Sequence, residues 1–239
     1  MTNKKERINK ALERAYQASI ELEKIKGFKK ANGILLMAKG LENAFDEILE
    51  ANTLDLEMSR ELAIPELMLN WLKLTPERLE TVIELLYHLK ELSDPIQRLM
   101  NASYQLQTSQ TYCQLMPLGV IAFIYEAFPE LSAIVAGFCL KTGNSLVLRG
   151  CNEASYSNKI IIKTIQNAIE EAELPSGCIE VLSCEEGTSI EELVKQTKLN
   201  LVIPYGRPSL INQVSQLSIA PVLKTTMGNC YLYWSSSGD

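Results

Sequence analysis

The stretch PLGVIAFIYEAFPE, residues 117–130, marks the point where the sequence changes from one texture to another. Its first half is an apolar run rich in β-branched residues, which is typical of a buried strand. Its second half is interrupted at Glu126, turns at Pro129 and continues in a helical pattern. This order predicts a strand that leads directly into a helix, and it raises the question whether the turn between them holds a ligand.

Downstream of this stretch, short apolar segments alternate with helical patterns. Strand, helix and strand in repeated order predict an α/β fold, with a parallel open sheet, right-handed crossovers and helices on both faces. The predicted strands are residues 118–125, 145–149, 179–183, 199–204 and 220–224, and the predicted helices are residues 129–143, 153–173, 189–196 and 208–216.

Upstream of residue 115 the sequence is a series of amphipathic helical patterns. In the pattern of residues 29–61, Gly33 and Gly40 are mild weaknesses within one long helix. Thr75 caps the last predicted helix and Pro76 takes its first position, while Pro95 ends it. The predicted helical segments are residues 6–26, 29–61, 64–74 and 74–95. We therefore divide the chain into a helical N-terminal region, residues 1–115, and an α/β nucleotide-binding core, residues 116–239.

Composition excludes several classes of function. The formal net charge is −6 and the sequence pI about 5.1, without the basic stripe that a nucleic-acid-binding protein requires. The N-terminus has no apolar signal core, and no apolar run reaches the roughly 18 residues of a membrane span. We therefore expect a soluble, cytoplasmic protein that binds neither nucleic acid nor membrane.

The cysteines do not indicate a metal site. There are six, none in a C-x-x-C pair, and His88 is the only histidine. Structural zinc sites require closely paired cysteines and histidines, so we predict no metal and reduced thiols. Cys139 and Cys178 lie in apolar runs and are predicted to be buried in the core. His88 is predicted to lie at the surface of a helix.

The familiar phosphate-binding motifs are also absent. No G-x-G-x-x-G follows a predicted strand, and there is no G-x-x-x-x-G-K-[ST]. Any nucleotide must therefore be held in another way.

Several blocks nevertheless resemble γ-glutamyl phosphate reductases, a branch of the aldehyde dehydrogenase superfamily. The N-terminal helical blocks are similar to that family's helical region. PLGVIAFIYEAFPE is similar to its P-[LI]-G-V-I-x-x-I-Y-E-[AS]-R-P-N turn. The order and spacing agree along nearly the whole chain. The other matching blocks are EILEANTLDLEMSRE (47–61), LKLTPERLETV (72–82), LSDP (92–95), CLKTGNSLVLRGCNEASYSN (139–158), LVIPYGRPSLINQV (201–214) and PVLKTTMGNCYLY (221–233).

The resemblance implies a reaction and a cofactor. The family uses NADPH to reduce γ-glutamyl phosphate to glutamate-5-semialdehyde in proline biosynthesis, through an active-site thiolate. The resemblance also implies cofactor-binding roles for Lys141, Asn144, Arg149, Glu153 and Gly206. In related dehydrogenases the basic residue at the position of Arg149 contacts the adenosine ribose or its phosphate, and the acidic residue lies near a ribose hydroxyl. An Arg149–Glu153 ion pair that caps the following helix is the alternative.

The family's nucleophile lies in a C-N-A-x-E motif on a separate catalytic domain, and this sequence contains no such motif. Cys230 matches an ordinary family cysteine, and Cys151 lies in the cofactor turn. We therefore expect the catalytic thiol domain to be absent and assign no catalytic residue. An exposed crevice would then favour homo- or hetero-oligomers.

The resemblance breaks at the turn that should position substrate. Phe128 stands where the family has Arg, and Glu130 where it has Asn. These changes remove a cation and add a carboxylate where an anionic substrate would bind, so we expect the turn at Glu126, Phe128 and Glu130 to be degenerate. The sequence thus predicts the NADPH-binding part of a reductase, inactive alone, that acts with a separate catalytic domain. The alternative is a pseudoenzyme that binds or oligomerises with a full-length relative.

Overall fold

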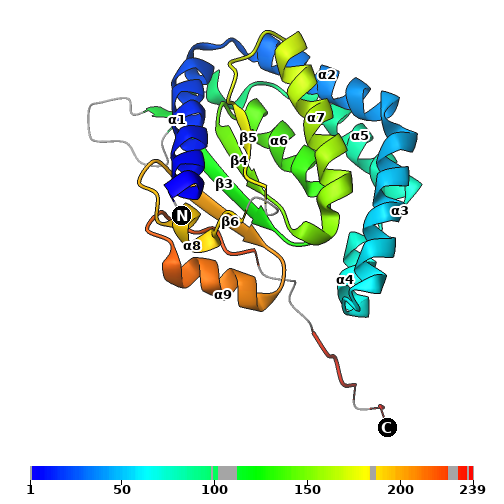
Figure 1. Cartoon of the computed structure of the whole chain (residues 1–239). Helices are drawn as coiled ribbons and strands as arrows, with labels where there is room; N and C mark the ends of the chain where they lie inside the picture. The colour runs from blue at the N-terminus through cyan, green and yellow to red at the C-terminus, as the bar shows by residue number, and fades with distance from the viewer. Residues whose placement is uncertain are drawn as a thin grey trace.

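The computed structural model describes residues 2–97, 99–101, 112–183, 187–225, 231–235 and 237–238 (Figure 1). Long helices precede an alternation of strands and helices. In chain order the elements are α1 (Thr2–Lys24), α2 (Gly27–Asn43), α3 (Phe45–Glu61), α4 (Glu66–Leu72), α5 (Pro76–Glu91), η1 (Pro95–Gln97), β1 (Leu99–Asn101), β2 (Tyr112–Gln114), β3 (Val120–Tyr125), α6 (Leu131–Lys141), β4 (Ser145–Arg149), η2 (Asn152–Ala154), α7 (Ser155–Glu171), β5 (Ile179–Val181), α8 (Ile190–Val194), β6 (Leu201–Tyr205) and α9 (Pro208–Leu217).

Four strands form the central sheet in the order β5-β4-β3-β6, and every neighbouring pair is parallel. The predicted parallel sheet is confirmed, and β3, the apolar half of the stretch at 117–130, is one of its two inner strands. Each predicted strand begins or ends within three residues of the observed one except the last. Residues 99–101 and 112–114 form an antiparallel pair, β1 and β2, that the sequence did not predict.

The predicted strand at 220–224 is wrong in extent, because only one bridge forms, between Val202 and Val222. Val202 donates to the carbonyl of Pro221, and Leu223 donates back to the carbonyl of Val202, both at 2.9 Å. The next residue of β6 on that side is Pro204, which has no N–H to extend the ladder. The pairing therefore ends after one bridge.

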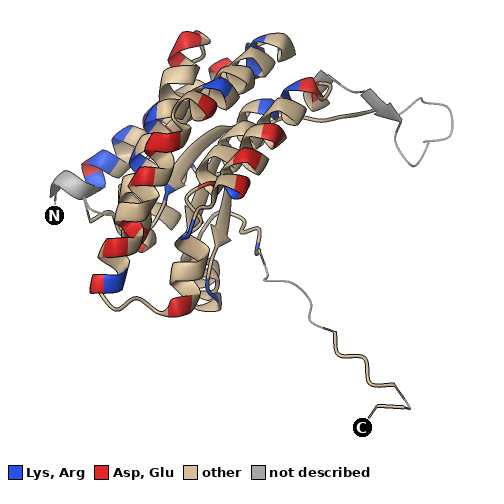
Figure 2. Ribbon diagram, turned by 90° about the vertical axis from the view of Figure 1, so that its right-hand side faces the viewer, with Lys and Arg blue, Asp and Glu red and all other residues tan. Residues whose placement is uncertain are grey.

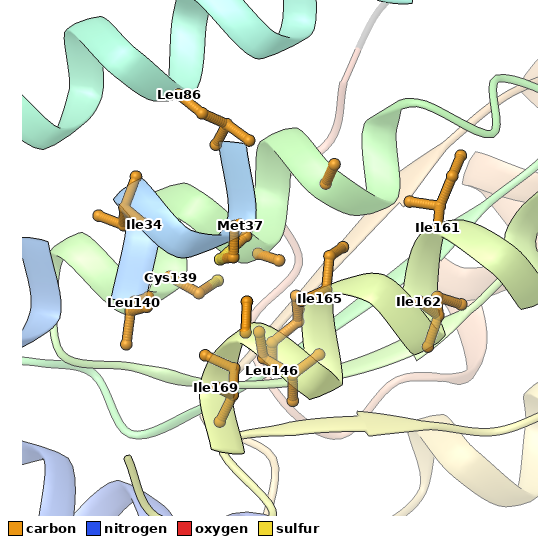
Figure 3. Close-up of a cluster of buried hydrophobic side chains, with 14 of the residues drawn as sticks. Ile34, Met37, Leu86, Cys139, Leu140, Leu146, Ile161, Ile162, Ile165 and Ile169 are labelled. Atoms are coloured by element: carbon orange, nitrogen blue, oxygen red, sulfur yellow. The ribbon is translucent and has the colours of Figure 1, made fainter. Parts of the chain in front are cut away.

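Helices cover both faces of the sheet, as predicted (Figure 1). Alternate residues of β3 point to opposite faces, so Val120, Ala122 and Ile124 join the core beneath α1, α8 and α9. Ile121 and Phe123 join the larger core on the other face, beneath α2, α5, α6 and α7. Figure 3 shows part of this larger core, where Met37, Leu86 and Ile165 belong to three different helices.

The predicted single helix at 29–61 is wrong, because the chain breaks at Ala44 between α2 and α3. The break lets α3 pack on α4 and α7 after α2 has packed on α5 and α7. Gly33 and Gly40 lie inside α2 and serve close packing. A Cβ at Gly33 would lie 2.5 Å from Leu174 Cδ1, and one at Gly40 would lie 2.8 Å from Thr164 Cγ2.

Other local predictions are confirmed. Thr75 accepts a hydrogen bond from the backbone of Arg78, and Pro76 is the first residue of α5. Cys139 and Cys178 are buried, and His88 is exposed. Figure 2 shows acidic and basic residues interspersed along the helices.

Two kinds of feature are absent from the described residues. No helix among them is long and apolar enough to cross a membrane, and no group of three or more of their His, Cys, Asp or Glu side chains could hold a metal ion.

Candidate nucleotide-binding site

The parallel register brings the carboxyl ends of three strands to one edge of the sheet. Ile124 of β3 lies beside Arg149 of β4, and Tyr125 lies beside Tyr205 of β6. The turns that follow these strands therefore meet at this carboxyl edge, which is where open α/β sheets bind their ligands.

Arg149 ends β4 at the carboxyl edge and is incompletely satisfied. Its Nη2 donates to the carbonyl of Thr188 at 3.3 Å, in the segment that follows β5. Its Nε is buried and has no hydrogen-bond partner among the described residues. No ion pair joins Arg149 to Glu153 in the described part of the chain, so the alternative of a helix-capping pair is not what the structure shows.

The N-terminus of α7 is instead occupied by Asp55 of α3, which is fully buried. Its carboxylate accepts hydrogen bonds from the backbone N–H groups of Tyr156 and Ser157, at 2.9 and 2.8 Å, and from the Ser157 hydroxyl at 2.5 Å. In open α/β sheets a helix N-terminus at the carboxyl edge can hold a phosphate. Here a carboxylate of the protein already holds those donors.

Glu153 and Cys151 lie together in the turn between β4 and α7. The Cys151 sulfur accepts a hydrogen bond from the backbone N–H of Ala127 at 3.1 Å. Burial, together with the negative charge of Glu153, raises the pKa of the Cys151 thiol to about 12. A thiol in these surroundings stays protonated and is a poor nucleophile, which agrees with its assignment to the turn.

The turn after β3 is strained and filled with aromatic rings. Ala127 and Phe128 have φ angles of 56° and 22°, in the left-handed region that L-residues rarely adopt. The Phe128 ring stacks on Trp71 of α4 with centroids 5.2 Å apart, and meets Tyr205 edge-on at 5.4 Å. The aromatic ring of Phe128, at a position where the family has Arg, is therefore packed against neighbouring rings.

A cation from another helix, which the sequence did not indicate, reaches the same turn. Arg78, from the first turn of α5, forms an ion pair with the buried carboxylate of Glu130, and its guanidinium carbon lies 5.7 Å from the centre of the Phe128 ring. The second carboxylate oxygen of Glu130 is buried with no partner among the described residues. The departures at 128 and 130 thus accompany an arginine that reaches the turn from another helix.

Glu126 and Gly206 form one unit with Arg207. The Glu126 carboxylate accepts hydrogen bonds from the backbone N–H of Arg207 at 2.8 Å and from its Nε and Nη2 at 3.1 and 2.8 Å. These bonds raise the pKa of Arg207. Gly206 is buried against Glu126, since a Cβ there would lie 2.6 Å from Oε2. Glu126 is thus an acceptor that fixes the turn, and Gly206 makes room for it.

Lys141 and Asn144 lie at the opposite, amino edge of the sheet, so the structure does not bring the five predicted cofactor residues together. The Asn144 side chain accepts hydrogen bonds from the backbone N–H groups of Leu118 and Gly119, at 2.7 and 3.0 Å. The Lys141 ammonium donates to the carbonyls of Lys90 and Leu92, at the end of α5. These contacts hold both side chains away from the carboxyl edge, and of the five predicted residues Arg149, Glu153 and Gly206 lie there.

Comparison with known proteins identifies the family of this chain. The model of the aldehyde dehydrogenase family matches residues 1–228. The chain belongs to the aldehyde dehydrogenase family. Gamma-glutamyl phosphate reductase 2 of Synechocystis sp. is 50% identical over 231 residues, which are 96% of this chain and 55% of that protein.

Solved structures of this family also match the chain. The gamma-glutamyl phosphate reductase of Thermotoga maritima matches with a TM-score of 0.83 at 30% identity, over 93% of this chain and 54% of that one. The glyceraldehyde-3-phosphate dehydrogenase GapN of Methanocaldococcus jannaschii, solved with NADP, matches with a TM-score of 0.74 at 17% identity, over 94% and 47%. This last likeness shows the aldehyde dehydrogenase fold alone. The chain spans about half the length of the curated relatives it matches.

Proposed function

We propose that this chain is the NADPH-binding part of a γ-glutamyl phosphate reductase, with Arg149 as the residue that binds the 2′-phosphate of the cofactor. The observation that carries this proposal is the buried Nε of Arg149, which has no hydrogen-bond partner among the described residues. A buried donor without a partner costs roughly 1–3 kcal/mol, and a phosphate oxygen would remove that cost. A guanidinium also matches a phosphate with two parallel hydrogen bonds.

The surroundings of Arg149 support this assignment. It ends a strand at the carboxyl edge, and no carboxylate among the described residues is paired with it. The N–H groups at the start of α7 already bind Asp55, so a phosphate must find its donors elsewhere at this edge. Glu153, half-buried one turn beyond Arg149, is the proposed acceptor for a ribose hydroxyl.

The bound NADPH would supply hydride, while the residues of this chain bind and orient it. The thiol that accepts the acyl group is assigned to a separate catalytic domain. Burial raises the pKa values of Cys139 and Cys178 to about 12, and Cys151 has a similar value. None of these three thiols has the electropositive surroundings of a catalytic cysteine. The chain by itself is therefore expected not to reduce γ-glutamyl phosphate.

Calorimetric titration with NADPH and with NADH tests the cofactor assignment. The unaltered chain should bind NADPH more tightly than NADH. Arg149→Met should weaken NADPH binding roughly tenfold or more, because one charge-assisted contact is worth about 1.5–3 kcal/mol, and should leave NADH binding nearly unchanged. Saturable binding of NADPH by the unaltered chain must be observed first, because the comparison with Arg149→Met depends on it.

Arg60→Met is the matched control, since Arg60 is an exposed arginine on α3. It should bind both cofactors as the unaltered chain does. Absence of saturable NADPH binding would exclude the cofactor-domain function. Saturable binding with equal losses for NADPH and NADH in Arg149→Met would reject only the 2′-phosphate assignment.

A further inference from the structure

A pocket outside the carboxyl edge lies where α2 begins and α5 and α6 end. Its volume is about 530 Å³, within the range of small-molecule sites. The start of α2 lies near the upper margin of the view in Figure 1, away from α4 and α9. The residues that line it are Lys26, Gly27, Phe28, Ala31, Leu92, Asp94 and Lys141.

Positive charge exceeds negative charge around this pocket. Lys141 and Lys30 are both more than nine-tenths buried, and Lys26 is exposed at the rim. The only carboxylate that lines the pocket, Asp94, is already paired with Lys30, at 3.0 Å. No carboxylate in the described part of the chain forms an ion pair with Lys141, so the two buried ammonium groups of Lys30 and Lys141 share the single negative charge of Asp94.

The contacts of Lys141 leave it able to bind a ligand. An ammonium has three N–H donors, and two of them are directed to the carbonyls of Lys90 and Leu92. No described residue accepts the third. Burial lowers the pKa of Lys141; the charge of Asp94 opposes this shift and that of Lys30 adds to it. An anion in the pocket would stabilise the charged form.

Two further features of the pocket favour an anion with an apolar body. The 17-residue helix α2 begins here without a side-chain hydrogen bond to its first turn. Asp94 lies beside its first residue, since a Cβ at Gly27 would lie 2.5 Å from Asp94 Oδ2, so the positive end of α2 adds to the charge of the lysines and Asp94 offsets part of it. Phe28 and Leu92, which are 73% and 61% exposed, offer apolar surface beside the charged groups. Isolated exposed apolar residues are common, and here two of them line one pocket.

We propose that this pocket binds a small monocarboxylate with an apolar body, held by Lys141 and Lys26 and packed against Phe28. A single negative charge fits the site best, because two buried ammonium groups share one carboxylate and that carboxylate, Asp94, repels a doubly charged anion such as phosphate. This site is independent of the cofactor site, since it lies at the other edge of the sheet.

Calorimetric titration of the whole chain with phenylpropionate tests the proposal, with phenylpropanol as the uncharged match. Phenylpropionate should bind saturably at millimolar concentration or below, and phenylpropanol should bind at least about tenfold more weakly, because it lacks the charge-assisted contact. Inorganic phosphate should not bind saturably. Equal binding of the acid and the alcohol, or no saturable binding of the acid, would overturn the proposal.

Variants locate the site. Lys141→Met should weaken phenylpropionate binding about tenfold and Lys26→Gln several-fold, and Phe28→Ala should weaken both the acid and the alcohol. Lys29→Gln is the control, because Lys29 lies in the same first turn of α2 but pairs with Glu173 at 3.4 Å outside the pocket. If circular dichroism shows that Lys141→Met is unfolded, Lys26→Gln and Phe28→Ala decide the result. Binding equal to the unaltered chain in those two variants would overturn the proposal.

Discussion

At the amino edge of the sheet, side-chain amides bind backbone N–H groups, whereas at the carboxyl edge charged side chains bind one another. Asn144 accepts from Leu118 and Gly119, and Asn200 accepts from Val120 at 2.9 Å. At the other edge Glu126 pairs with Arg207, and Glu130 pairs with Arg78. The first arrangement fixes where strands begin. The second fixes the turns and leaves Arg149 as the group with an unused donor.

This difference between the two edges indicates which of them carries the functional site. At the amino edge these contacts satisfy the backbone N–H groups of Leu118, Gly119 and Val120, so they stabilise the loops that precede the strands. Among the described residues, the carboxyl edge has two buried polar atoms without partners, Glu130 Oε2 and Arg149 Nε, and two adjacent non-glycine residues with positive φ, Ala127 and Phe128. The amino edge has one of each, Ser145 Oγ and Glu173. Strain and unsatisfied groups persist where the surrounding structure over-determines them, which is common at functional sites.

The largest effect is expected for Asp55→Ala, which removes the carboxylate that caps α7 near the carboxyl edge. Two backbone N–H groups and one hydroxyl lose their acceptor in a buried place, so the free energy of unfolding should fall by about 3 kcal/mol. Urea unfolding followed by circular dichroism measures this change. Glu57→Gln, on the exposed side of the same helix, should leave the midpoint within experimental error.

The amino edge should respond in proportion to the hydrogen bonds that each amide accepts. Asn144→Ala should lower the free energy of unfolding by about 2 kcal/mol, because two backbone N–H groups lose their partner, and Asn200→Ala by about 1 kcal/mol, because one does. Urea unfolding of both variants gives the ratio. NADPH binding, by calorimetry, should be unchanged in both. A selective loss of NADPH affinity in Asn144→Ala would return that residue to the cofactor site.

The sequence predicted the layout of the carboxyl edge because chain order determines it. Arg149 ends one predicted strand and Glu126 follows another, and the carboxyl ends of parallel strands meet. The same rule places Lys141 and Asn144 at the amino edge, because both precede the strand at 145–149. The resemblance grouped them with Arg149 by motif. Topology alone would have separated them.

Other parts of the site could not be predicted from local sequence. Asp55 contacts residues 101 and 102 positions away, and Arg78 contacts Glu130 across 52 positions. Each lies in a helical pattern that indicates only amphipathicity. The one available signal was the joint departure at Phe128 and Glu130, since a carboxylate added in a buried turn requires a cation nearby. The identity of that cation required the packing of α5 against the turn.

Buried thiols make stability depend on alkaline pH, and Cys139, near the amino edge in α6, shows the effect most simply. Its pKa is raised by burial to about 12 in the folded chain, from an unfolded value near 9. Its contribution is fully present below pH 9 and is lost as pH rises towards 12, because the unfolded thiol releases its proton first. Between pH 8 and pH 10 this one thiol should account for about 1 kcal/mol.

Urea unfolding of the unaltered chain and of Cys139→Ala, at both pH values, isolates that contribution. The cavity left by the substitution lowers stability equally at pH 8 and pH 10, so only the difference between the two pH values reports the thiol. The loss on going to pH 10 should be smaller in Cys139→Ala by about 1 kcal/mol. Equal losses in both proteins would show that the thiol is not kept protonated by burial.

The smallest effect is expected at the Glu126–Arg207 pair, which tests whether charge pairing at the carboxyl edge contributes stability or geometry. The Arg207 side chain is 48% exposed and that of Glu126 14%, so solvent screens much of their attraction. A double-mutant cycle with Glu126→Gln and Arg207→Gln should give a coupling energy of about 0.5 kcal/mol, and high salt should reduce it. The backbone N–H of Arg207 keeps an acceptor in Glu126→Gln, because an amide oxygen can replace the carboxylate there. A coupling above about 2 kcal/mol that salt does not change would mean that the pair is shielded from water and fixes the turn as the amides fix the amino edge.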